Sequence, residues 1–196
     1  MATTQQSTLT SKPAKKPRDR MSVEEFLALE DDEGGFAEYV NGEVIRWSPT
    51  LQHQQLLLFL ATTLCHFVEE RDLGEVIIAA YKVRLKTDTV REPDILFVAN
   101  EIRDRLTEQY LDGAPTLAVE LISPESRTRD RRDKLREYAD AGVLEYWLID
   151  AERERAEFYR LDEDGVFVAI PLVEETYFRS VVLAGFWLDI DRKSVV

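Results

Sequence analysis

Two acidic residues, Asp94 and Glu120, lie in short apolar segments where a carboxylate is unexpected. Asp94 opens residues 94–98, and Glu120 lies within residues 117–122. Short apolar runs of this kind form buried strands, and burying an ionised carboxylate is costly unless a cation pairs with it. Two such carboxylates on strands that could lie side by side indicate a divalent metal site.

Each acid also has a simpler interpretation. Both faces of residues 117–122 are apolar, which predicts a central strand with Glu120 buried. An arginine of the following helix could pair with this carboxylate. Asp94 follows Pro93, and a Pro–Asp dipeptide is by itself a turn signal. Metal ligation is favoured because both acids need a positive partner.

A third candidate, Lys134, lies on a helix predicted over residues 128–141 and ended by Gly142. Its position is at the margin of the apolar face. Glu120 lies ~7 Å below the end of its strand, and Lys134 lies ~9 Å into the helix. The two side chains can therefore meet if the helix runs back along the strand. The alternative is a lysine that reaches solvent at the edge of the core.

Arginines near the start of this helix are candidates for phosphate contact. Arg127 and Arg129 lie close to the helix N-terminus, where backbone N–H groups also favour anions. Acidic residues are interspersed among them, so a solvated helix face is the alternative.

Composition indicates one soluble domain. The 196 residues are 44% hydrophobic and carry a net charge of −13, which opposes long-range attraction of nucleic acid. A metal-dependent nuclease nevertheless needs carboxylates in its site. The apolar runs are shorter than the ~20 residues of a membrane-spanning helix, and the single Cys65 suits a reducing compartment. We expect a cytoplasmic protein without a membrane partner.

The chain order predicts an α/β or α+β fold with a mixed sheet. Residues 1–20 indicate a disordered basic tail, and residues 21–196 a single domain. The expected helices span residues 23–30, 51–70 and 128–141. The expected strands span residues 36–40, 43–47, 75–80, 81–86, 94–98, 117–122, 143–150, 157–161 and 166–171, with a hairpin turn at Asn41–Gly42.

Together these motifs resemble the Uma family of putative restriction endonucleases, within the PD-(D/E)XK nuclease superfamily. The resemblance covers residues 21–190. It rests on Pro93–Asp94, residues 119–124, Asp130, Lys134, Tyr138, residues 142–150, residues 38–44 and His53. It implies a restriction-endonuclease-like core, a central mixed β-sheet flanked by helices, with Mg²⁺ or Mn²⁺ held by Asp94 and Glu120.

One position departs from the superfamily pattern, in which a lysine stands two residues after the acid. Here that position holds Ile122. Either the lysine role has moved to Lys134, as the resemblance implies, or the site is inactive. The Leu121 carbonyl is a further candidate ligand.

Three residues are candidates for supporting roles: Glu38, His53 and Tyr138. The alternatives are an exposed or arginine-paired residue for Glu38, and helix capping or solvation for His53.

We therefore expect a Mg²⁺-dependent endonuclease that hydrolyses DNA, acting as a homodimer. One alternative is an inactive nuclease-fold module that binds DNA or protein. Another is an oligomeric structural protein that uses an exposed edge near Tyr146 and Trp147.

Overall fold

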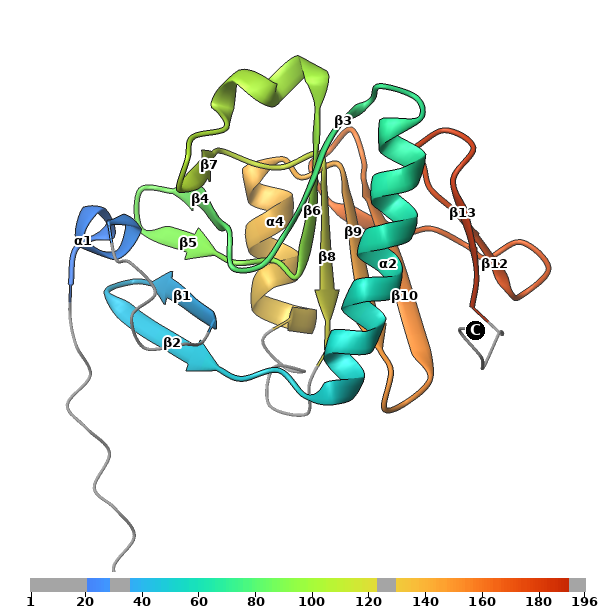
Figure 1. Cartoon of the computed structure of the whole chain (residues 1–196), viewed down its shortest axis with the longest axis horizontal. Coiled ribbons are helices and arrows are strands. Elements are labelled where there is room, and N and C mark those ends of the chain that lie inside the picture. Colours follow the sequence, from blue (N-terminus) through green and yellow to red (C-terminus); the bar gives the residue numbers. More distant parts are fainter. Residues whose placement is uncertain (1–20, 29–35, 123–129, 191–196) are drawn as a thin grey trace, which may run out of the picture.

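The computed structural model describes residues 21–28, 36–122 and 130–190. The predicted tail at residues 1–20 and the arginines Arg127 and Arg129 lie outside these ranges. Figure 1 shows the chain as sheets packed with helices on either side. The predicted mixed fold with flanking helices is confirmed.

A six-stranded mixed sheet forms the centre of the molecule, in the order β11-β10-β9-β8-β6-β3. Its central pair, β8 and β9, is parallel, and its other pairs are antiparallel. The strands are β3 (Gly74–Ile78), β6 (Ile95–Ala99), β8 (Leu117–Leu121), β9 (Glu145–Asp150), β10 (Arg155–Leu161) and β11 (Phe167–Ala169).

Two helices cover opposite faces of this sheet (Figure 1). Helix α2 (Leu51–Glu69), capped by Thr50, packs on the face that carries Leu117 and Val119. Helix α4 (Leu135–Ala141) packs through Tyr138 on the face that carries Ala118. The predicted alternation of residues 117–122 between two apolar faces is thus observed, and it buries Glu120 on the α4 side.

A second, five-stranded sheet has the order β2-β1-β5-β4-β7 and packs beside the first. Its strands are β1 (Phe36–Val40), β2 (Glu43–Trp47), β4 (Lys82–Lys86), β5 (Thr89–Arg91) and β7 (Tyr110–Asp112). The short helix α1 (Val23–Leu27), which begins with a capping box of Ser22 and Glu25, closes its apolar face through Phe26. This sheet matters for the site because β1 and β5 carry two of its charged residues.

Four smaller elements complete the described chain. A 3₁₀ helix, η1 (Asn100–Arg105), follows β6, and strands β12 (Tyr177–Arg179) and β13 (Trp187–Asp189) form a two-stranded sheet. A π-helical turn, η2 (Asp130–Lys134), leads directly into α4, which Gly142 ends in the left-handed region at φ 90°. The helix predicted over residues 128–141 is therefore wider than an α-helix in its first described turn.

The structure corrects two expectations. The Tyr146–Trp147 region is not an edge, because β9 lies between β10 and β8 and both side chains are completely buried. The strand predicted from Asp94 begins at Ile95, so Asp94 immediately precedes it. Among the described helices, none is both long and apolar enough to cross a membrane.

Candidate active site at the ends of strands β6 and β8

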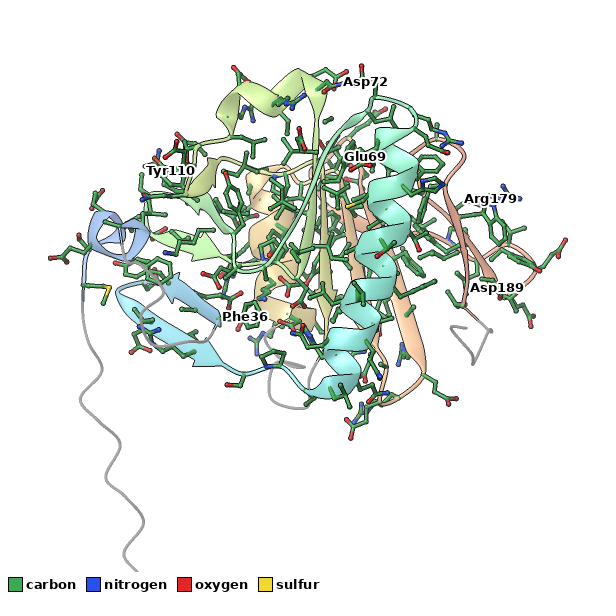
Figure 2. The ribbon with its side chains drawn as sticks, in the orientation of Figure 1. Phe36, Glu69, Asp72, Tyr110, Arg179 and Asp189 are labelled. Atoms are coloured by element: carbon green, nitrogen blue, oxygen red, sulfur yellow. The ribbon has the colours of Figure 1, made fainter. Side chains whose placement is uncertain are left out.

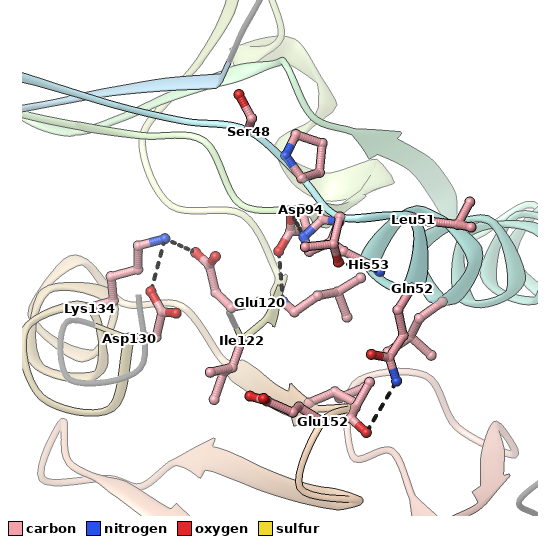
Figure 3. A pocket seen from close by; sticks show the side chains of 16 residues that line it. Ser48, Leu51, Gln52, His53, Asp94, Glu120, Ile122, Asp130, Lys134 and Glu152 are labelled. Carbon is pink, nitrogen blue, oxygen red and sulfur yellow. Dashed lines mark hydrogen bonds and ion pairs between the residues drawn. The ribbon is translucent and has the colours of Figure 1, made fainter. Parts of the chain in front are cut away.

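A cavity of about 350 Å³ opens where β8 ends, between the start of α2, the π-helical turn and the end of β9 (Figure 3). Its charged lining residues are Asp94, Glu120, Asp130, Lys134 and Glu152, joined by His53. Figure 2 shows that the surrounding interior is densely filled with side chains. The two acids predicted as metal ligands, Asp94 and Glu120, therefore line the same cavity.

Asp94 is held in place by hydrogen bonds from two directions. The antiparallel pairing of Ile95 with Val119 places Asp94 beside Glu120. Oδ1 of Asp94 lies 3.0 Å from Nε2 of His53, and Oδ2 accepts a hydrogen bond of 2.7 Å from the backbone N–H of Leu121. Asp94 is 4% exposed, and these two contacts fix the orientation of its carboxylate.

Glu120 uses one of its carboxylate oxygens for two partners. Oε1 lies 2.8 Å from Nζ of Lys134 and accepts a hydrogen bond of 2.8 Å from the hydroxyl of Tyr138. Within the described residues Oε2 accepts no hydrogen bond, and it is the oxygen left for a ligand. Burial raises the pKa of Glu120 to about 8, although Lys134 acts in the opposite direction.

The ammonium of Lys134 is surrounded by three carboxylates. Nζ lies 2.7 Å from Oε1 of Glu38, 2.8 Å from Oε1 of Glu120 and 3.4 Å from Oδ1 of Asp130. The side chain is 1% exposed. Burial by itself lowers the pKa of Lys134, but the three carboxylates raise it above its ordinary value. Lys134 is thus a buried ammonium, and not a lysine that reaches solvent.

Glu38 and Tyr138 complete the surroundings of Lys134 and Glu120. Glu38, from β1, is fully buried, and its Oε2 lies 2.9 Å from Nη1 of Arg91. Burial raises the pKa of Tyr138 well above its ordinary value, and the hydroxyl remains a donor to Glu120. The arginine-paired alternative for Glu38 is therefore observed, together with its contact to Lys134.

The model of one protein family, Uma2, described as "Putative restriction endonuclease", matches residues 23–191. The chain belongs to the Uma2 family. An uncharacterized protein of Synechocystis sp. is 28% identical over 152 residues, which cover 76% of this chain and 78% of that protein. The predicted family resemblance is confirmed.

A solved structure gives the same answer for the fold of this Uma2 protein. The crystal structure of a putative nuclease belonging to DUF820 from Anabaena variabilis matches it with a TM-score of 0.72 and 18% sequence identity. The match covers 87% of this chain and 95% of that one. At 18% identity, this likeness supports the fold alone and says nothing about the reaction.

The donor atoms of the Uma2 site fit a hard cation such as Mg²⁺. Mg²⁺ is held in proteins by one or two carboxylates, with water and substrate oxygens filling the other positions. Asp94 and Glu120 supply such a pair. Within the described chain no cluster of three or more His, Cys, Asp or Glu residues could hold a metal by itself. An ion held by this pair would take its remaining ligands from water or substrate.

Two residues of this network were missed by the sequence prediction as site residues. Arg91, on the three-residue strand β5, bridges Glu38 and Glu137. Asp130 is buried beside Lys134. The available signal was charge: Arg91 lies three residues before Asp94, and Asp130 lies one helical turn before Lys134.

Proposed function

We propose that this protein is a metal-dependent endonuclease that hydrolyses phosphodiester bonds of DNA. One observation carries the proposal: two carboxylates from neighbouring strands and one lysine from the following helix converge on a single cavity. Asp94 lies beside Glu120 in the sheet, and Nζ of Lys134 lies 2.8 Å from Glu120. The family and the fold support a nuclease of the restriction-endonuclease class.

In this proposal, Asp94 and Glu120 would hold Mg²⁺ or Mn²⁺, and the carbonyl of Leu121 would be a further ligand. When bound, the ion lowers the pKa of a water molecule and polarises the scissile phosphate. Lys134 orients that water or stabilises the charge that develops on the phosphate. Tyr138 fixes Oε1 of Glu120 by its hydrogen bond, which leaves Oε2 directed to the cavity.

His53 and Glu38 have supporting roles. His53 fixes Asp94 through Nε2, while no partner of its Nδ1 is found among the described residues. Glu38, on β1, holds Lys134 through the contact of 2.7 Å between its Oε1 and Nζ. We propose Arg127 and Arg129 as phosphate contacts that offset the net charge of −13.

The alternative function, an inactive nuclease-fold module, is favoured by one observation. Three carboxylates surround Nζ of Lys134 at distances of 2.7 to 3.4 Å, so the ammonium is already engaged in ion pairs. Ile122, which lines the cavity, occupies the position where the superfamily has its lysine. An active enzyme must weaken one of these ion pairs when substrate enters.

A cleavage assay separates the two functions. Supercoiled plasmid and single-stranded DNA are incubated with Mg²⁺, Mn²⁺ or EDTA, and products are resolved on gels. We expect metal-dependent cleavage that Asp94→Asn abolishes and that the exposed control Asp112→Asn preserves. Calorimetric binding of Mn²⁺ without any cleavage would instead support the inactive module. The homodimer stays a prediction, which light scattering after size-exclusion chromatography tests.

A further inference from the structure

Arg91 joins the five-stranded sheet to the helix that follows the candidate site. It lies on β5, is 1% exposed, and contacts two carboxylates on different elements. Nη1 lies 2.9 Å from Oε2 of Glu38 on β1, while Nε and Nη2 lie 2.8 Å and 2.5 Å from Oε2 of Glu137 on α4. The planar fork of arginine suits such a bridge, which a single ammonium cannot reproduce.

This bridge determines which oxygen of Glu38 faces Lys134. Arg91 takes Oε2, and Oε1 is left 2.7 Å from Nζ of Lys134. Glu137, the other partner of Arg91, lies three residues after Lys134, so the guanidinium is anchored to the same helical segment that carries the lysine. Arg91 itself does not line the cavity.

Lys134 needs a second negatively charged partner when a divalent cation is bound at Glu120. In the metal-free protein Oε1 of Glu120 lies 2.8 Å from Nζ. A divalent cation held by the same carboxylate would repel the ammonium, and repulsion between like charges is strong where water is excluded. Glu38 is the partner on the five-stranded sheet, and Arg91 keeps it in place.

We propose that Arg91 is a positioning residue that holds Glu38 in the orientation required to retain Lys134 beside Glu120 when a divalent cation binds. The inference rests on the proposed nuclease function and extends it. In this inference the five-stranded sheet contributes Arg91 and Glu38 to the positioning of Lys134, in addition to its packing role.

The first test observes the ammonium of Lys134 without relying on cleavage. Buried ammonium groups exchange slowly enough for a ¹H–¹⁵N correlation, and Lys134→Met assigns the signal. We expect the wild-type signal to persist when Mg²⁺ is added and to be lost on Mg²⁺ addition in Arg91→Gln. The matched control is Arg84→Gln, which removes another arginine–carboxylate fork of the same sheet, with Asp112. It should retain the signal.

The second test measures steady-state cleavage. Misplacing a catalytic group by about 1 Å can cost about 10²-fold in rate, so we expect Arg91→Gln to lower kcat by about 10²-fold with KM nearly unchanged. Arg91→Lys, which keeps the charge without the fork, should recover only part of this loss. A merely structural role would lower the folded fraction and leave kcat per folded molecule unchanged.

The outcomes separate this inference from the proposed function. If the wild-type protein cleaves no substrate, the nuclease function is wrong. The NMR signal of Lys134 then still tests whether Arg91 positions Glu38 and Lys134. If the signal in Arg91→Gln survives Mg²⁺ as in wild type, the inference is wrong. If Arg91→Gln does not fold, Glu137→Gln is used in its place, because it removes only the partly exposed carboxylate partner of Arg91. We then expect faster exchange of the Lys134 signal with Mg²⁺, and unchanged exchange would overturn the inference.

Discussion

Replacing Glu120 by glutamine should remove a pH-dependent weakness of the metal-free protein. Burial raises the pKa of Glu120 from 4.5 in its ordinary state to about 8 in the folded chain. Between these two values the folded state keeps a proton that the unfolded state has released. The stability that this proton provides is complete below pH 4.5, falls as the pH rises, and is gone above pH 8.

The size of the effect follows from the width of this window. It spans about 3.5 pH units, and each unit is worth about 1.4 kcal/mol, which gives about 5 kcal/mol in total. Glutamine has no such titration. The free energy of unfolding of Glu120→Gln, relative to wild type, should therefore rise by about 5 kcal/mol between pH 4.5 and pH 8.

Urea unfolding followed by tryptophan fluorescence measures this difference, since Trp147 is fully buried against Phe158 and Phe178. The experiments are performed with EDTA from pH 5 to pH 8.5. Asp112→Asn is the control, because the hydrogen bond from Arg84 lowers the pKa of that carboxyl from 3.8 and its contribution is lost only in more acidic solution.

A constant difference between Glu120→Gln and wild type across this range would refute the reasoning. It would mean that the ion pair with Lys134 outweighs burial and keeps Glu120 ionised throughout. An unfolded Glu120→Gln protein would point to the same conclusion, since it would show that the charge of Glu120 is required to stabilise buried Lys134.

Three further predictions concern the ligands, the lysine and the backbone. Asp94→Asn should abolish Mn²⁺ binding measured by calorimetry, and retained affinity would exclude Asp94 as a ligand. Lys134→Ala should abolish plasmid cleavage with little change in Mn²⁺ affinity, and adding Ile122→Lys should restore part of the activity; full activity of Lys134→Ala would show that another residue has its role. Gly74→Ala should cost about 3 kcal/mol, because its Cβ would lie 2.1 Å from a backbone oxygen of β6. Gly142→Ala, which meets open space, should cost only about 1–2 kcal/mol, and equal melting temperatures would contradict this.

The acids of the site were predictable because each breaks a local pattern. Asp94 and Glu120 are isolated carboxylates in apolar segments, a signal that requires no knowledge of the fold. The proximity of Lys134 to Glu120 was predictable from the rise per residue of a strand and of a helix, since few residues separate the two in sequence. The helix α2 and the β1–β2 hairpin likewise follow from local signals, the apolar periodicity and Asn41–Gly42.

The second sheet and Arg91 could not be found in the same way. Strands β5 and β7 have three residues each, which is too short for an alternating pattern to show. The parallel pairing of β4 with β7 joins residues that are distant in sequence, and only the assembled fold specifies it. Arginine is rarely fully buried, so the sequence by itself gives no reason to place Arg91 in the interior, and its two carboxylate partners come from other elements.

The three carboxylates around Lys134 also imply an order in which the chain folds. Asp130 and Glu120 are 4 and 14 residues away from the lysine, whereas Glu38 is 96 residues away. Closing the longer loop has the larger entropic cost. The strand β8, the π-helical turn and α4 can therefore come together early, while the lysine is still hydrated. Docking of β1 then removes its water, so we expect the last step of folding to be the step that completes the charge cluster.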